Sequence, residues 1–316
     1  MSWIASPAQL KRRGVLGMNR RNIMLIGQHN DRRRFPLVDD KLKTKQLAQE
    51  AGIAVPGLIS LIQYQHQVRE IGQFLSAHSS FCIKPAKGSG GKGILVIHDH
   101  DNQNYYKPNN QCLSQTELKR HLSNILAGLF SLGGQPDKAI IEALIHFDNR
   151  FVRYSFEGVP DIRIIVFCGY PIMAMMRLST EASDGKANLH QGAVGVGLHI
   201  DNGKAAFAVQ FDKPVAEHPD TGQALDQLVI PEWRKLLIMA ARCYEITGLG
   251  YLGVDIVLDA HQGPMLLELN ARPGLAIQIA NNVGLEQRMS QLQTVIPQNL
   301  SPLDRVSAVQ QLFQSS

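Results

Sequence analysis

The segment YLGVDIVLDAHQGPMLLELNARPG carries two carboxylates whose spacing predicts a cation site. We expect a β-hairpin with its turn centred on residues 261–262, which places Asp255 opposite Glu268. Asn270 lies two residues beyond Glu268 and therefore points from the same face of its strand. Two opposed carboxylates repel each other unless a cation lies between them, and carboxylate and amide oxygens suit Mg²⁺. The pattern predicts Asp255, Glu268 and Asn270 as metal ligands, with a slipped turn or an ion pair to Arg272 as the alternative.

A glycine-rich stretch between two apolar segments predicts a phosphate-binding flap. Its members are Gly88, Ser89, Gly90, Gly91, Lys92 and Gly93. Aliphatic residues follow the glycines where a dinucleotide site needs a helix, and Ala86 stands where a Walker A loop needs glycine. A protein kinase has its lysine after the loop, whereas Lys84 precedes this one. We therefore expect backbone N–H groups and nearby lysines to bind phosphate oxygens, with a plain hairpin turn as the alternative.

Helices and strands in an α+β order must position these residues. The periodicity predicts helices over 41–50, 65–77, 114–130 and 231–247, and strands over 81–85, 94–97, 138–145, 161–168, 172–178, 193–200, 204–211, 251–258 and 265–270. Residues 102–110 are expected to form a loop, and the chain beyond the last strand is expected to be helical. This order suggests a basic amino-terminal segment over 1–37, a flap lobe over 38–137 and a metal-site lobe over 138–316.

Composition describes an ordinary globular chain. Its 316 residues suggest about two lobes, and 44% hydrophobic content is enough to form their cores. No apolar run is long enough to span a membrane and no signal peptide is recognisable, so we expect a cytoplasmic protein without membrane contact. The four cysteines are widely scattered and are expected to be reduced and structural.

Positive charge is concentrated at the amino terminus. Residues 1–45 hold eleven Lys or Arg against three Asp, a net charge of +8, so the other residues account for −3 of the total +5. Such a segment suits an acidic partner or an anionic substrate, and a solvated arm is the alternative. Few aromatic residues accompany it, which argues against a nucleic-acid partner.

Five segments together resemble the ATP-grasp ligases, and within them the α-L-glutamate ligase branch, which contains relatives of the ribosomal-protein glutamate ligase. They are DDKLKTKQLAQEAGIAVP, FCIKPAKGSGGKGILVI, DIRIIVFCGYPIMAMMRLS, ANLHQGAVG and LLELNARPG, and they cover about residues 14–290. The resemblance implies an ATP-grasp fold in which two α+β lobes clasp ATP. It also implies that a shortened amino-terminal region replaces the usual Rossmann-like domain.

The same resemblance implies a role for each matching residue. ATP contacts are implied for Lys41, Lys84, Gly88, Ser89, Gly90, Gly91, Lys92, Gly93, Glu142, Ala143, Leu144, Asp161 and Asn188. Within that set, Glu142 to Leu144 form the hinge that reads adenine. Contact with the transferred phosphoryl group is implied for the catalytic residues Arg163, Arg177 and Lys84. Two Mg²⁺ ions, or Mn²⁺ in their place, are implied at Asp255, Glu268 and Asn270.

The implied reaction is carboxylate activation. ATP phosphorylates the carboxylate of an amino acid or peptide, and an amine attacks the acyl phosphate to form an amide. Glutamate or another amino acid is expected as one of the two substrates, and the identity of the activated carboxylate stays open. The acceptor amine stays open between a free amino acid, a peptide and a protein, because the domain that helps to build the acceptor site is the one replaced here. The alternatives are a catalytically inactive ATP-binding regulator or scaffold with a basic arm, an ATP-grasp kinase and a carboxylase. The oligomeric state also stays open, and a homo-oligomer is possible.

Overall fold

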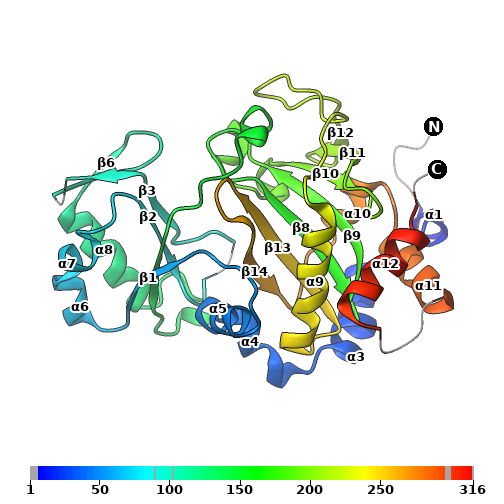
Figure 1. Cartoon of the computed structure of the whole chain (residues 1–316), viewed down its shortest axis with the longest axis horizontal. Coiled ribbons are helices and arrows are strands. Elements are labelled where there is room, and N and C mark those ends of the chain that lie inside the picture. The colour runs from blue at the N-terminus through cyan, green and yellow to red at the C-terminus, as the bar shows by residue number, and fades with distance from the viewer. Residues whose placement is uncertain (1–5, 89, 102, 296–299, 315–316) are drawn as a thin grey trace. The chain divides into compact units, whose positions relative to one another are not determined.

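The computed structural model describes residues 6–88, 90–101, 103–295 and 300–314, and the chain divides into two compact units (Figure 1). The larger unit contains residues 1–39, 47–54 and 147–316, and the smaller unit contains residues 40–46 and 55–146. Helix α5 (Lys41–Glu50) contributes residues to both and has the bounds that the sequence predicted.

The smaller unit is built on a four-stranded antiparallel sheet in the order β1-β7-β2-β3. These strands are β1 (Leu58–Ile62), β2 (Phe81–Pro85), β3 (Leu95–Ile97) and β7 (Ala139–Glu142). Three helices accompany the sheet: α6 (Gln65–Arg69), α7 (Ile71–Leu75) and α8 (Gln115–Leu126). Side chains from the strands and helices form one buried core that includes Phe81, Leu118 and Ile141.

Two local expectations for the smaller unit are wrong. The helix expected over 65–77 is two helices, because Glu70 leaves helical geometry at φ −95° and ψ 9°. The loop expected over 102–110 contains β5 (Asn104–Tyr106), the central strand of a small sheet with β4 (Asp99–His100) and β6 (Cys112–Ser114). Tyr105 in β5 is fully buried, so a single inward side chain anchors this otherwise polar segment.

The larger unit is built on a seven-stranded antiparallel sheet in the order β12-β11-β10-β9-β8-β13-β14. Its strands are β8 (Asp161–Phe167), β9 (Tyr170–Leu178), β10 (Val194–Leu198), β11 (Ala205–Gln210), β12 (Lys213–Pro214), β13 (Tyr251–Asp259) and β14 (Gly263–Asn270). Helices α9 (Trp233–Thr247) and α10 (Ala276–Asn281) pack on the sheet, followed in the chain by α11 (Leu285–Val295) and α12 (Pro302–Leu312).

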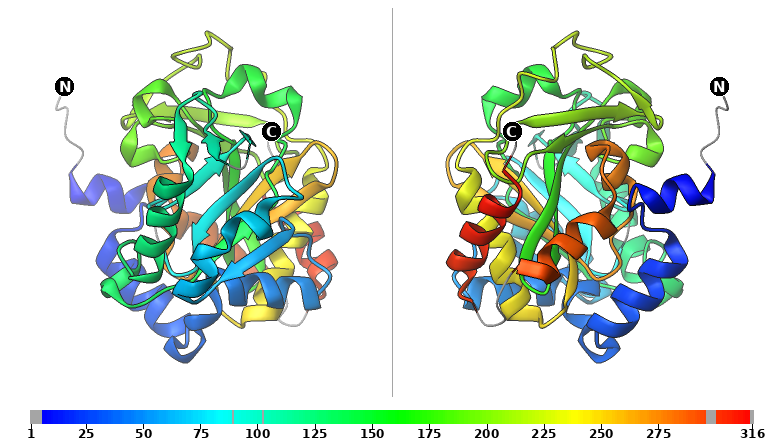
Figure 2. Two further views of the ribbon diagram at one scale, coloured as in Figure 1. Left: turned by 90° about the vertical axis from the view of Figure 1, so that its left-hand side faces the viewer. Right: turned by 90° about the vertical axis from the view of Figure 1, so that its right-hand side faces the viewer.

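The basic amino-terminal segment packs within the larger unit and is not a solvated arm. It forms short helices: α1 (Pro7–Arg12), α2 (Met18–Arg20), the π-helix η1 (Arg21–Ile26), α3 (Gly27–His29), the 3₁₀ helix η2 (Arg32–Arg34) and α4 (Pro36–Asp39). The buried Asn30 side chain donates to the carbonyl oxygens of Tyr251 and Ala271. Figure 2 shows the blue amino-terminal helices beside the orange α10 and α11, where the Glu286 N–H donates to the Gly14 carbonyl.

The observed division also differs from the expected boundary at residue 138. Strand β7 lies beyond that boundary, yet it hydrogen-bonds to β2 and β1, so the smaller unit continues to residue 146. In the described part of the chain, every helix is too short or too polar to cross a lipid bilayer.

Candidate functional site

The hairpin of β13 and β14 places Asp255 opposite Glu268, as the sequence predicted. The expected turn centre is wrong by half a residue, because Asp259 pairs with Gly263 and the turn is therefore centred on His261. A bulge between Asp255 and Ile256 shifts the register by one residue and brings the two carboxylates opposite each other.

Strands β8 and β9 add two arginines and a third carboxylate to the same face of the sheet. Arg163 lies opposite Asp255, and Arg177 lies opposite Asp161. Arg163 donates to Asp255 through Nε at 2.8 Å and Nη2 at 2.6 Å. Arg177 donates to both oxygens of Asp161 at 2.5 and 2.6 Å, and its Nη2 also reaches Asp255 Oδ2 at 2.8 Å. We call Asp161, Arg163, Arg177 and Asp255 the acid–arginine row.

The charges within the row shift the pKa values of its two aspartates in opposite directions. Burial raises the pKa of Asp161 to about 6; the charge of Arg177 opposes this shift, and the charge of Asp255 adds to it. Burial also acts to raise the pKa of Asp255, but the charges of Arg163 and Arg177 outweigh it and lower the pKa to about 2. Asp255 is therefore ionised at neutral pH, as a metal ligand must be.

The residues at the end of the row fit a hard cation. Guanidinium N–H groups use one lone pair of Asp255 Oδ1 and both of Oδ2, so one acceptor position of this carboxylate is left. Glu268 and Asn270 add oxygen atoms from β14 that could bind a cation. Asn270 Oδ1 also accepts a hydrogen bond from the Arg272 N–H at 2.8 Å. Arg272, the alternative ion-pair partner, contacts Asp39 through Nη2 at 2.6 Å. The described residues contain no cluster of three His, Cys, Asp or Glu that could hold a metal, so the candidate set needs the amide of Asn270.

Asn188 lies outside the acid–arginine row. Its Oδ1 accepts the His190 N–H at 3.1 Å and caps the short 3₁₀ helix Leu189–Gln191. The role implied for Asn188 at the phosphates of ATP stays a prediction.

In the smaller unit, the candidate ATP residues surround a buried carboxylate. Glu142 lies opposite Cys82 in the sheet, two positions along β2 from Lys84 on the same face. Glu142 Oε2 accepts from Lys84 Nζ at 2.8 Å, and Glu142 Oε1 accepts from Lys45 Nζ at 2.7 Å. All three side chains are buried, and Lys45 Nζ also donates to the Pro56 carbonyl.

The charges in this triad hold Glu142 ionised. Burial acts to raise the pKa of Glu142, but Lys84 and Lys45 outweigh burial and lower it. Burial lowers the pKa of Lys45, and the charge of Glu142 opposes that shift. The Ala143 N–H donates to the Gly57 carbonyl at 2.8 Å, which leaves Leu144 as the hinge residue whose N–H could meet a base.

The glycine-rich loop joins β2 to β3 as a flap, with Ser89 outside the described residues. Gly90 and Gly91 have φ values of 63° and 74°, which side-chain-bearing residues rarely adopt. Lys41 Nζ donates to the Gly88 carbonyl at 2.6 Å, so the first residue of α5 contacts the start of the loop. Lys92 is exposed on the flap.

Sequence reasoning missed Lys45. It lies one helical turn after Lys41 in α5, and residues four apart share a helix face, so the KxxxK spacing was the available signal.

Comparisons with known proteins give a family match and distant relatives. The sequence model of a family described as sugar-transfer associated ATP-grasp matches residues 20–294. A probable alpha-L-glutamate ligase of Aeromonas salmonicida (strain A449) is 22% identical over 241 residues, 75% of this chain and 57% of the relative. A probable alpha-L-glutamate ligase of Maridesulfovibrio salexigens is 27% identical over 237 residues, 75% of this chain and 56% of the relative. The chain thus spans little more than half the length of these curated relatives.

Solved structures give a weaker likeness. The ATP-grasp ligase PsnB complexed with a minimal precursor has a TM-score of 0.48 and 16% identity, covering 96% of this chain and 72% of that one. D-alanyl-alanine synthetase A of Vibrio cholerae has a TM-score of 0.49 and 10% identity, covering 83% of this chain and 65% of that one.

Proposed function

Because the chain belongs to the sugar-transfer associated ATP-grasp family, we propose that it catalyses ATP-dependent formation of an amide bond between a carboxylate and an amine. The observation that best supports this proposal is the pairing of Asp255 with Glu268 beside Arg163 and Arg177. One sheet face thereby combines oxygen ligands for a cation with two guanidinium groups that suit phosphoryl oxygens.

Each group has a physical role in this reaction. Asp255, Glu268 and Asn270 would hold Mg²⁺, which draws charge from phosphate oxygens when it is bound. Arg163 and Arg177 stabilise negative charge on the transferred phosphoryl group and on the tetrahedral intermediate. In the smaller unit, Lys84 and the flap N–H groups bind phosphate oxygens.

Glutamate is the proposed source of one reacting group, because the curated relatives are named as probable glutamate ligases. Experiments must determine whether the amine acceptor is a free amino acid, a peptide or a protein. An ATP-grasp kinase would produce a stable phosphorylated product in place of an amide, so identification of the product separates the two reactions.

The variant Glu268→Gln tests the metal role. Removing one anionic oxygen ligand is expected to lower the rate of Mg²⁺-dependent ADP release by at least about 100-fold. Glu217→Gln is the matched control, because Glu217 is exposed and lies outside the acid–arginine row. ADP release is measured with Mg-ATP across single amino acids and pairs, with mass spectrometry for new amides. A folded Glu268→Gln protein that turns over at the wild-type rate would rule out the metal assignment.

A further inference from the structure

A small hollow lies in the larger unit at the carboxyl end of α10. Its volume is about 210 Å³. The apolar residues Leu198, Ala206, Phe207 and Val283 line it together with the polar residues His199 and Arg288. The hollow is too small for a nucleotide or a folded peptide segment and is suited to one small molecule.

Arg288 is one of the residues that line this hollow, and its side chain is partly buried. Its guanidinium lies over the Phe313 ring, 4.3 Å from the ring centroid. Within the described part of the chain, its side chain has no ion pair and no hydrogen bond. Burial lowers the pKa of Arg288, and the charge of Asp201 opposes that shift from beyond ion-pair distance. A guanidinium carries five N–H donors, so this environment leaves its hydrogen-bonding capacity unused.

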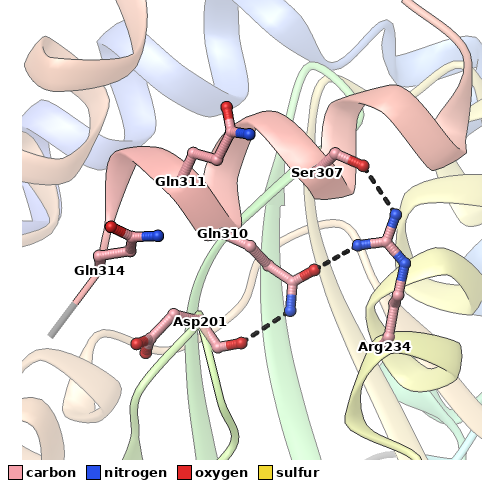
Figure 3. A pocket seen from close by; sticks show the side chains of 6 residues that line it. All are labelled: Asp201, Arg234, Ser307, Gln310, Gln311 and Gln314. Carbon is pink, nitrogen blue, oxygen red and sulfur yellow. Dashed lines mark hydrogen bonds between the residues drawn. The ribbon is translucent and has the colours of Figure 1, made fainter.

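A second pocket in the same unit contains an arginine whose side chain does form hydrogen bonds (Figure 3). There Arg234 donates to Gln310 Oε1 at 2.6 Å and to Ser307 Oγ at 2.7 Å. Gln310 in turn donates to the Asp201 carbonyl at 2.7 Å. Arg234 thus makes two hydrogen bonds to lining residues of its own pocket, whereas Arg288 makes none to the described residues.

The hollow is separate from the acid–arginine row. Gly195 and Gly197 share the sheet face of Arg177, and a Cβ atom on Gly197 would lie 2.3 Å from the Ala280 carbonyl oxygen. Helix α10 therefore packs directly on that face, and the hollow begins where the helix ends, at Asn281 and Asn282.

We propose that the hollow beside Arg288 binds a small carboxylate with an apolar body. The guanidinium fork matches the two oxygens of a carboxylate, and the apolar lining receives the rest of the molecule. The site goes beyond the proposed ligase reaction, because none of its lining residues belongs to the groups assigned to ATP, metal or phosphoryl transfer.

The test uses 3-methylbutanoate as probe and 3-methylbutanamide as its neutral match. Methyl-labelled protein is titrated with each, and the Val283 resonances, assigned with Val283→Ala, report occupancy. We expect saturable binding of the carboxylate and at least about tenfold weaker binding of the amide, because the amide cannot form the charge-assisted hydrogen bonds that a carboxylate accepts from a guanidinium. Inorganic phosphate is titrated separately, and tighter binding of phosphate than of 3-methylbutanoate would overturn the assignment to a carboxylate.

Variants connect the binding to Arg288. Arg288→Gln is expected to weaken 3-methylbutanoate binding at least about tenfold, whereas the matched control Arg234→Gln leaves it unchanged. Ala206→Phe adds a ring at another residue that lines the hollow and is expected to abolish binding, which keeps the proposal testable if Arg288→Gln does not fold. Wild-type affinity in a folded Arg288→Gln or Ala206→Phe protein, or absence of saturable binding to wild type, overturns the proposal.

Discussion

At the scale of single residues, the triad of Lys45, Glu142 and Lys84 stabilises a buried carboxylate and also contains a lysine proposed to bind phosphate. A buried carboxylate is costly unless cations accompany it, and here two lysines contact its two oxygens. Two cations and one anion leave a net positive charge. A net positive charge suits the phosphate group that Lys84 is proposed to bind.

Loss of Lys45 is expected to destabilise the fold. Lys45→Met leaves Glu142 with one of its two cations in a buried site, and breaking such a pair costs about 3 kcal/mol. Lys43→Met is the matched control, because Lys43 is exposed on the same helix and its loss should change stability by less than about 0.5 kcal/mol. Urea unfolding measures both, and equal stabilities of the two variants would contradict the role of Lys45.

The two buried aspartates predict two separate pH windows for stability. The folded pKa of Asp255, about 2, lies below its unfolded value of roughly 4. Its contribution is therefore present above about pH 4 and is lost as pH falls towards 2. The folded pKa of Asp161, about 6, lies above its unfolded value. The folded state then holds an extra proton between about pH 4 and 6, so the contribution of Asp161 decreases as pH rises through that window.

Asp161→Asn separates these windows. In the variant, the free energy of unfolding should no longer decrease with rising pH between about pH 4 and 6 on account of residue 161. The loss of stability at lower pH, which comes from Asp255, should remain. Urea unfolding of wild type and variant at small pH steps gives the difference directly. A difference in unfolding free energy that is constant across both windows would refute the assignment.

At the scale of elements, the β13–β14 hairpin illustrates what sequence alone could predict. Counting outward from an assumed turn centre at residues 261–262 placed Asp255 opposite Glu268, and the half-residue error in that centre is compensated by a bulge between Asp255 and Ile256. The bulge that produces this register was not foreseen, because a bulge shifts one residue without changing the alternation on either side. The neighbours Arg163 and Arg177 were assigned to phosphoryl transfer from resemblance alone. Their ion pairs with Asp255 depend on strand order, which local periodicity does not encode.

The contact between α10 and β10 predicts a strong effect of a small substitution. A Cβ atom at position 197 would lie 2.3 Å from the Ala280 carbonyl oxygen and 2.7 Å from the Asn281 Cα. Gly197→Ala is therefore expected to destabilise the protein by about 1–3 kcal/mol. At Gly17, where φ is −85° and nothing lies within 4 Å of a Cβ, alanine should change stability by less than about 0.5 kcal/mol. Thermal or urea unfolding compares them, and a neutral Gly197→Ala would contradict the close packing.

At the scale of the whole molecule, the ATP-grasp fold and its α+β character were predicted from five short motifs, and the family match confirms them. The division into units was predicted less well. Strand β7 follows a long excursion from β2, and only long-range hydrogen bonds assign it to the smaller unit. The amino-terminal segment was likewise placed apart from the rest because its charge dominates its composition, whereas its residues Leu16 and Leu25 are buried.

The proposed ligase reaction depends on transfer of a phosphoryl group to a carboxylate. In the proposed step a carboxylate oxygen attacks the γ-phosphorus and ADP leaves. The amine would then attack the acyl carbon, lose a proton and expel phosphate that carries the former carboxylate oxygen.

Oxygen-isotope transfer tests this step most directly. Glutamate and each candidate amino-acid or peptide partner are labelled in turn with ¹⁸O in their carboxylates, each is incubated with the protein, Mg-ATP and the unlabelled partner, and the released phosphate is examined by mass spectrometry. A ligase transfers one ¹⁸O atom to phosphate for each amide formed when the labelled substrate is the one whose carboxylate is activated. ADP and phosphate released without label from either substrate, or a stable phosphorylated product in place of an amide, would contradict it.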